Sequence, residues 1–251
     1  MQAGTDQLEQ RVDVRQVPAK MIYLANRHPR LTRAEFAERW RRHATIGGSL
    51  DPRIREVAAL RYCLTNDPAG ILPSATNEHD GVALLALRSL LSTPAMASLL
   101  VENEVAYADE LRTFERPVED FTLFTASELL VAGDETPVVV IDLVRRRPEL
   151  APNTYFRTDD EARETNLAES GLLELGLRRW VRNALVGTPA RGFAYDAVHE
   201  LWFDSLAAVA DARTGLETYF GRLASTTDRR NSTLLVTTVI EQIGPDLPAS
   251  S

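Results

Sequence analysis

Four side chains of this sequence have the types that acid–base chemistry at neutral pH requires. His43 carries a group whose ordinary pKa lies near 7, so it is the candidate general acid or base. Tyr23 and Tyr62 offer hydroxyl groups that can donate a hydrogen bond to a developing enolate or phenolate oxygen. Arg61 can pair with a carboxylate or an enolate oxygen. Their spacing in the sequence does not show that they lie close together in space, so a catalytic site made of these four residues is a hypothesis.

Each of these residues also has an ordinary structural interpretation. His43 suits the end of a helix, where the negative pole of the dipole favours a histidine. Tyr23 and Tyr62 are common strand residues whose hydroxyls reach water, and Arg61 can be a solvated neighbour. The sequence leaves both interpretations open.

Aromatic residues accompany His43 on one predicted helix. Thr32 is a good N-cap and Glu35 completes a capping box, so a helix begins here. Phe36, Trp40 and His43 follow at i, i+4 and i+7, which places them on one face of that helix. Residues that can shape an apolar ligand cleft are Phe36, Trp40, Trp180 and Trp202. Plain core packing explains the same periodicity.

His199 is the second histidine with a possible ligand role. By strand alternation it shares a face with Leu201 and Phe203, which predicts a place at the cleft. A haem axial ligand and a core histidine with a satisfied hydrogen bond are the alternatives. One cysteine, Cys63, excludes an internal disulfide and a multi-cysteine metal site. We predict no metal and no cofactor; the sequence also lacks the glycine-rich nucleotide motifs and the G-x-S-x-G of serine hydrolases.

Composition bounds the class of protein. The 251 residues are 44% hydrophobic and 25% charged, and 36 acidic against 28 basic residues give a net charge of −8. That charge argues against binding to nucleic acid, whose phosphates it would repel. The polar start, residues 1–16, does not resemble a secretory signal, and apolar runs such as 82–87 are too short to cross a bilayer. We expect a soluble cytoplasmic protein that does not bind membranes.

The order of elements repeats within the chain. After a polar arm (1–17), strands are expected at 21–25, 59–65, 81–87 and 121–131, with helices from Thr32 to about Gly47 and over 93–114. After a linker at 132–135, strands at 138–144, 177–181, 195–206 and 232–243 alternate with helices at 159–175 and 206–223. The segment 144–150 matches 25–31 almost position for position. The chain is therefore predicted to duplicate a β-α-β-β-α-β unit, with repeats at 18–133 and 134–251.

This order predicts the fold class. One unit forms a four-stranded antiparallel sheet with both helices on one face, which leaves the other face apolar and bare. Two units in one chain can cover those faces by packing sheet against sheet as a barrel. The predicted class is α+β, with two ferredoxin-like repeats forming a dimeric α+β barrel within one chain.

The segment 27–36 (RHPRLTRAEF), followed by Trp40 and His43, resembles the EthD-like family of the dimeric α+β barrel superfamily. Asp80 and Asp196 are similar to that family's residues at the start of the third strand. The resemblance covers 18–132 well and 137–243 more weakly. In the family, tryptophan and histidine usually lie four residues apart on this helix, whereas here they lie three apart. The first helix of the second repeat has neither and carries Glu164, Asn166 and Glu169 instead.

The resemblance implies a cleft between sheet and helices that holds a hydrophobic molecule. We expect a cofactor-independent enzyme of secondary metabolism that acts on an aromatic or polyketide-like intermediate as a cyclase, dehydratase or isomerase. A non-catalytic binding protein for a hydrophobic ligand and, less favoured, a haem-binding protein are the alternatives. The expected partner is a small hydrophobic substrate, with a homodimer as a further possibility.

Overall fold

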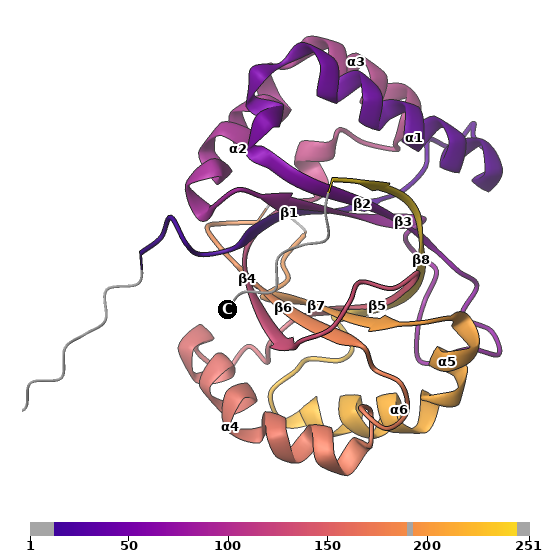
Figure 1. Cartoon of the computed structure of the whole chain (residues 1–251), viewed down its shortest axis with the longest axis vertical. Coiled ribbons are helices and arrows are strands. Elements are labelled where there is room, and N and C mark those ends of the chain that lie inside the picture. The colour runs from indigo at the N-terminus through magenta and orange to yellow at the C-terminus, as the bar shows by residue number, and fades with distance from the viewer. Residues whose placement is uncertain (1–12, 190–192, 245–251) are drawn as a thin grey trace, which may run out of the picture.

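The computed structural model describes residues 13–189 and 193–244, in which eight strands close into a single barrel (Figure 1). Around the barrel the order is β1-β3-β2-β8-β5-β7-β6-β4, and every neighbouring pair is antiparallel. The strands are β1 (Ala19–Ala25), β2 (Val57–Thr65), β3 (Gly81–Leu87), β4 (Thr122–Val131), β5 (Val138–Val144), β6 (Arg179–Leu185), β7 (Ala197–Phe203) and β8 (Thr233–Ile243). The predicted fold class, two ferredoxin-like repeats forming one α+β barrel, is confirmed.

Two seams join the repeats. The fourth strand of each repeat pairs with the second strand of the other, as β4 with β6 and β8 with β2. Ser127 lies opposite Asn183 at the first seam, and Cys63 opposite Val239 at the second. Since both seams are paired, neither sheet presents an open edge.

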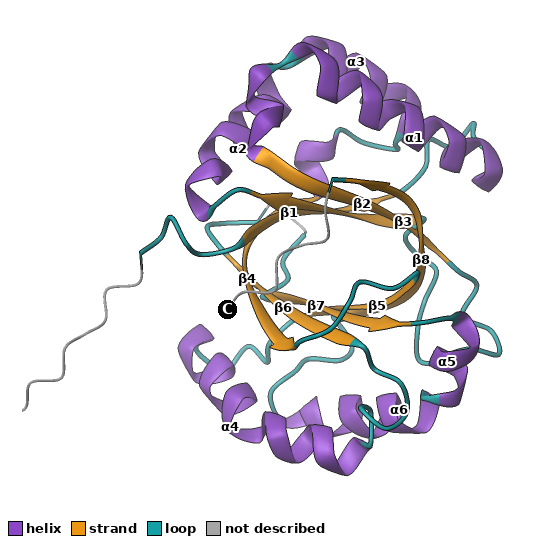
Figure 2. Ribbon diagram, viewed as in Figure 1, coloured by secondary structure: helices purple, strands orange, loops and turns teal. Residues whose placement is uncertain are grey.

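The helices lie outside the barrel, each group against the sheet of its own repeat (Figure 2). The first repeat carries α1 (Arg33–Leu50), α2 (Thr93–Glu102) and α3 (Glu104–Thr113), and the second carries α4 (Pro152–Ser170), α5 (Leu206–Asp211) and α6 (Arg213–Arg222). Short 3-10 turns lie at Pro52–Glu56, Leu90–Ser92, Val118–Phe121 and Leu223–Ser225. No helix in the described ranges is long and apolar enough to span a bilayer.

Three predicted helix boundaries are wrong. The helix expected over 93–114 is two helices, because Asn103 leaves the helical conformation and its side chain accepts a hydrogen bond from the Ala106 amide to cap α3. α4 begins at Pro152 rather than at 159, and it ends at Ser170 rather than at 175, where Gly171 caps it with a left-handed φ of 64°. The expected helix 206–223 breaks at Ala212. Most of the predicted arm, residues 1–12, lies outside the described residues.

The sequence match between 25–31 and 144–150 corresponds to one structural device used twice. The backbone amide of Arg27 donates to Asp80 Oδ2 at 2.9 Å, and that of Arg146 donates to Asp196 Oδ2 at 2.9 Å. Each arginine side chain also pairs with the same carboxylate and donates to the carbonyl four residues further on. In both repeats the device therefore ties the end of the first strand to the start of the third.

The barrel interior has an apolar part and a charged part. Inward side chains such as Ile22, Val82 and Ile141 form a buried cluster. Nearer the start of β1, Lys20 Nζ contacts Glu200 Oε1 at 2.5 Å, and Asn183 Nδ2 donates to the same oxygen at 2.8 Å. The ion pair crosses from one repeat to the other with both side chains buried, so breaking it would strand a charge in the interior.

A glycine lets the first helix approach the sheet. A Cβ placed on Gly81 would lie 2.4 Å from the Trp40 ring and 2.8 Å from the Cys63 carbonyl oxygen. We expect Gly81→Ala to lower the free energy of unfolding by about 1–3 kcal/mol, because neither neighbour can retreat within a packed core. Urea denaturation measures this change.

The matched control is Gly221→Ala in α6, where a new Cβ meets nothing within 4 Å. Alanine is the better helix former, so this variant should be as stable as the wild type or up to about 1 kcal/mol more stable. Equal losses in the two variants would contradict the packing account.

Candidate functional site

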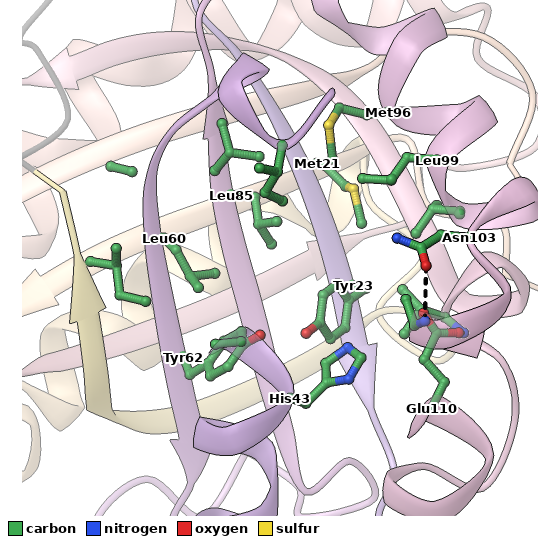
Figure 3. Close-up of a pocket in the computed structure, with 18 of the residues that line it drawn as sticks. Met21, Tyr23, His43, Leu60, Tyr62, Leu85, Met96, Leu99, Asn103 and Glu110 are labelled. Carbon is green, nitrogen blue, oxygen red and sulfur yellow. Dashed lines mark hydrogen bonds between the residues drawn. The ribbon is translucent and has the colours of Figure 1, made fainter. Parts of the chain in front are cut away.

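A cavity of about 270 Å³ lies between the sheet of the first repeat and its helices (Figure 3). β1, β2 and β3 form its floor, and α1, α2 and α3 cover it. Its apolar lining includes Met21, Leu60, Leu85, Met96, Leu99 and Leu100. The walls suit a hydrophobic molecule, since large aliphatic and thioether groups make up most of the lining.

Polar side chains gather at one end of this cavity (Figure 3). They are Tyr23 from β1, Tyr62 from β2, His43 from α1, and Asn103 and Glu110 from the α2–α3 region. An apolar cavity with a few converging polar groups is the usual form of a small-molecule site. Its polar end can orient a ligand that carries one oxygen function.

His43 is held by a carboxylate. Its Nδ1 lies 2.9 Å from Asp109 Oδ2, and both side chains are largely buried. Asp109 also pairs with Arg39, and its hydrogen bond with His43 holds the pKa of the Asp109 carboxyl below its usual range. Because an ionised carboxylate can only accept a hydrogen bond, the proton of a neutral His43 imidazole lies on Nδ1. Nε2 is then the basic nitrogen available to a ligand.

The two tyrosines lie beside Trp40. The Trp40 indole donates to Tyr23 Oη at 3.0 Å, and its ring stacks on the Tyr62 ring with centroids 4.4 Å apart. Burial raises the pKa of both phenols above the ordinary value, so both stay protonated at neutral pH. Tyr62 lines the cavity, so its protonated hydroxyl can donate a hydrogen bond to a ligand there.

Glu110 is a buried carboxyl at the same end. It is 3% exposed, and its Oε2 accepts a hydrogen bond from the Val118 amide at 2.9 Å. Burial raises the pKa of Glu110, with the Val118 hydrogen bond opposing the shift. A carboxyl with a raised pKa can act as a proton donor nearer neutral pH than an exposed one.

Three of the four predicted catalytic residues, Tyr23, His43 and Tyr62, line this one cavity. Arg61 does not, because successive side chains on β2 point to opposite faces. It points inward, 1% exposed, and its Nε donates to Glu135 Oε2 at 2.7 Å. The expectation that Arg61 shares a site with Tyr62 is therefore wrong.

Sequence reasoning missed Asp109 and Glu110. Both lie in the segment predicted as one long helix, where acidic residues are unremarkable on a solvated face. What marks these two carboxyl groups as possible site residues is their burial, 9% and 3% exposed, and that burial depends on how α3 packs on α1. A sequence pattern alone does not contain that packing.

Phe36 and Trp40 lie behind the cavity and do not line it. Both are 0% exposed, with ring centroids 5.1 Å apart in a stacked pair. Trp40 also stacks on Tyr62 at 4.4 Å with an interplanar angle of 16°. They hold the phenol of Tyr62 in place and belong to the core.

The equivalent face of the second repeat has different chemistry. Asp142 lies two residues before the end of β5, as Tyr23 does in β1. Arg182 lies opposite His199 on the neighbouring strand, as Tyr62 lies opposite Ala83 in the first repeat. Asp142 and Arg182 are therefore the equivalents of the two tyrosines. Asp142 accepts two hydrogen bonds from Arg229, and the Arg182 guanidinium pairs with the Asp159 carboxylate. The further partners of Arg182 are Asp160 and Glu128. Ion pairs thus replace the tyrosine pair there.

The remaining predicted ligand residues lie away from the cavity. Trp180 is buried under α6 and donates to His199 Nδ1 at 3.0 Å, with Tyr219 edge-on to its ring. Trp202 is buried and points to the barrel interior, between Leu201 and Phe203, which face outward. None of the three reaches Tyr62 or His43, so the expected single cleft does not include them.

The comparisons with known proteins establish the fold. No family model and no curated protein matches the sequence. Among solved structures, a candidate monooxygenase from Fusobacterium nucleatum matches with a TM-score of 0.54 and 10% identity over 92% of this chain and 97% of that one. An anthrone oxidase-like protein matches with a TM-score of 0.54 and 12% identity over 93% and 96%. A variant chlorite dismutase from Candidatus Nitrospira defluvii matches with a TM-score of 0.50 and 11% identity over 88% and 91%. The chain therefore has the dimeric α+β barrel fold.

Haem does not fit the described residues around His199. The ring is 2% exposed, its Nδ1 already accepts from Trp180, and its Nε2 is buried without a partner. A haem needs an open slot beside its axial ligand. Here the buried Trp180 ring packs beside the His199 ring, and the buried Tyr219 ring packs edge-on against Trp180. The proposed haem ligation through His199 is therefore not supported by the packing.

The pKa of Glu110 yields a prediction for stability. Because burial raises the pKa of Glu110, the native state binds the carboxyl proton more tightly than the unfolded chain does. The carboxyl therefore destabilises the native state increasingly as the pH rises above its pKa in the unfolded chain, about 4.3. We expect Glu110→Gln to unfold at a higher temperature than the wild type near pH 8, with the difference vanishing near pH 4. Thermal unfolding followed by circular dichroism at both pH values measures this.

Glu38→Gln is the control, since Glu38 lies exposed on α1 and pairs with Arg41 and Arg42 on the surface. It should change the unfolding temperature little at either pH. A Glu110→Gln variant that is equally destabilised at both pH values would contradict the assignment of Glu110 as a buried carboxyl with a raised pKa.

Proposed function

We propose that this chain is a cofactor-independent enzyme of the EthD-like type that moves a proton on a hydrophobic aromatic or polyketide-like intermediate. One observation carries the proposal. The His43–Asp109 pair and the Tyr62 hydroxyl face the same end of an otherwise apolar cavity. A base, a group that orients it, and a donor for a developing oxyanion are the parts that such chemistry needs.

The first chemical step is removal of a proton from a carbon that a carbonyl group acidifies, either next to that carbonyl or conjugated with it across a ring, as in anthrone. His43 Nε2 accepts this proton, and the electron pair of the C–H bond moves into a new C=C bond while the carbonyl oxygen becomes an enolate. Asp109 stabilises the imidazolium that forms. The Tyr62 hydroxyl donates to the enolate oxygen, and the Trp40 ring stacked on Tyr62 holds its phenol in place.

Return of the proton completes the reaction. Reprotonation by His43 at a different carbon gives an isomer. Attack of the enolate carbon on a second carbonyl closes a ring and leaves an alkoxide, which takes the proton back from His43. Loss of a hydroxyl group as water needs a general acid, for which Glu110 is placed at the same end. The cyclase, dehydratase and isomerase activities thus share one first step, and the arrangement supports this class rather than one member.

Two features support an aromatic substrate. The cavity is apolar away from its polar end, and one of the structural neighbours is named as an anthrone oxidase-like protein. That neighbour shares the fold at 12% identity, so its name guides the choice of probe only. A role in secondary metabolism, a cytoplasmic location and a homodimer stay predictions.

Anthrone is a suitable probe, because its C10 hydrogens lie opposite a ketone across a flat aromatic system. The test is the rate at which these hydrogens exchange for deuterium in D₂O under argon, followed by proton NMR. We expect the wild type to accelerate exchange above buffer and His43→Ala to lose that acceleration by a factor of about 10² or more. Tyr62→Phe should lose a smaller factor, because the base remains.

His28→Ala is the matched control, since His28 lies in the loop before α1 and outside the cavity. It should exchange anthrone as the wild type does. Acceleration that survives in His43→Ala would overturn the proposal. Binding of anthrone with no acceleration in the wild type would favour the alternative, a non-catalytic protein that carries a hydrophobic ligand.

A further inference from the structure

Asn103 lines the cavity beside His43, and the proposed proton transfer makes no use of it. It lies at the junction of α2 and α3, in the cover of the cavity, whereas Tyr62 lies on β2 in the floor. Its side chain is half-buried, while the neighbouring Glu102 and Glu104 are both exposed. A polar side chain that lines an otherwise apolar cavity, on a different wall from Tyr62, is a candidate contact for a ligand.

Three hydrogen bonds hold Asn103 in place. Its backbone amide donates to the Leu99 carbonyl at 3.2 Å, and its backbone carbonyl accepts from the Tyr107 amide at 2.9 Å. Its side-chain Oδ1 accepts from the Ala106 amide at 3.0 Å. Because a backbone N–H can only donate, this last bond determines which end of the side-chain amide is the oxygen. The Nδ2 group is therefore oriented before a ligand binds, which lowers the entropy cost of binding.

The Nδ2 group of Asn103 is a hydrogen-bond donor that faces the cavity. Figure 3 shows this nitrogen pointing into the cavity, while the oxygen of the same amide points to the start of α3. Within residues 13–189 and 193–244, no group of the protein accepts a hydrogen bond from Nδ2. A primary amide carries two N–H donors, so an oxygen atom of a ligand in the cavity can accept a hydrogen bond here.

The lining of the cavity favours an uncharged ligand oxygen. Among the described residues, no lysine or arginine lines the cavity, and the Glu110 carboxyl lies at the same end as Asn103. A carboxylate or phosphate of a ligand would meet no cation there, and an ionised Glu110 would repel it. An uncharged oxygen needs only a hydrogen bond to offset its loss of hydration. Ketone, ether and phenol oxygens belong to this class.

We propose that the substrate carries two uncharged oxygen functions on its apolar frame. One is the carbonyl oxygen to which Tyr62 donates from the floor, and the other accepts a hydrogen bond from Asn103 Nδ2 in the cover. Asn103 then determines specificity by binding the second oxygen, and it transfers no proton. That oxygen belongs to the substrate of the reaction proposed above, so its assignment rests on the proposed function, whereas its binding can be measured without turnover.

Anthrones with one substituent on an outer ring are the probes. A methoxy group supplies an oxygen that can only accept a hydrogen bond, and an ethyl group has the same size without an oxygen. Both groups are placed in turn at each of the four free carbons of one outer ring, and the compounds are titrated into the full chain under argon by isothermal titration calorimetry. The quantity measured is the ratio of the ethyl to the methoxy dissociation constant, in which the contribution of the anthrone frame cancels.

Two variants remove the amide donor and keep the helix cap. Aspartate and serine are N-caps as good as asparagine, so Asn103→Asp and Asn103→Ser retain an oxygen for the Ala106 amide, and circular dichroism checks that α3 is intact. We expect the ratio at one ring position to fall by a factor of about 3 to 10 in both variants, which is the contribution of one neutral hydrogen bond. Asn153→Asp, exposed in the first turn of α4, makes the same charge change outside the cavity and should leave the ratio unchanged.

Two results would overturn the proposal. Equal ratios in the wild type and both Asn103 variants at every ring position would leave Asn103 as a helix cap alone. An anthrone with a carboxylate at the responsive position that binds more tightly than its ethyl match would contradict the assignment of an uncharged oxygen.

The deuterium exchange assay separates these results from a failure of the proposed function. A ratio that depends on Asn103, without accelerated exchange in the wild type, supports the second oxygen and removes the acid–base enzyme. Accelerated exchange with a ratio that does not depend on Asn103 supports the enzyme and removes the second oxygen. A wild type that binds none of these anthrones contradicts both.

Discussion

The pairing of strands across the two repeats is the constraint on which the other features depend. Because β4 joins β6 and β8 joins β2, the sheets close and every strand has one inward and one outward face. Because successive side chains of a strand point to opposite faces, the position of a residue in its strand determines whether it points into the barrel or out toward the helices. Tyr23 and Tyr62 point outward to the helices and the cavity, while Lys20 and Arg61 on the same two strands point inward to buried ion pairs. The same closure creates both the outer cavity and the charged end of the barrel interior.

Duplication gave two equivalent outer faces, and the residues at equivalent positions have made them different. In the first repeat, Tyr23 and Tyr62 carry neutral hydroxyls beside an open cavity. In the second, Asp142 and Arg182 engage in ion pairs with Arg229 and Asp159 under α4 and α6. Buried ion pairs need close partners, so they fill the space that a ligand would use. The fold keeps its symmetry in the Arg27–Asp80 and Arg146–Asp196 devices, whereas the site does not.

Much of this fold could be predicted from the sequence because it depends on order and periodicity. The repeat of strand and helix patterns, with the match of 25–31 to 144–150, indicated two β-α-β-β-α-β units, and the barrel follows from their bare apolar faces. Helix boundaries were less predictable. The break at Asn103 depends on a side-chain cap, and the early start of α4 at Pro152 has no N-cap side chain to mark it.

The site could be predicted only where a residue type was distinctive. His43, Tyr23 and Tyr62 stand out by chemistry, and the structure places them at one cavity. Arg61 was misplaced because its inward direction depends on strand register, and Asp109 and Glu110 were missed because their burial depends on the packing of α3. Trp40 and Trp180 were expected to touch a ligand, but large aromatic rings at helical or strand spacing most often fill a core, as they do here.

The most direct test of the central claim is a crystal structure of the protein with anthrone bound. The account predicts the rings between Met96, Leu99 and the sheet, the ketone oxygen within hydrogen-bonding distance of Tyr62 Oη, and C10 facing His43 Nε2. Anthrone bound elsewhere on the molecule, or bound in this cavity with its ketone turned toward the apolar walls, would contradict it.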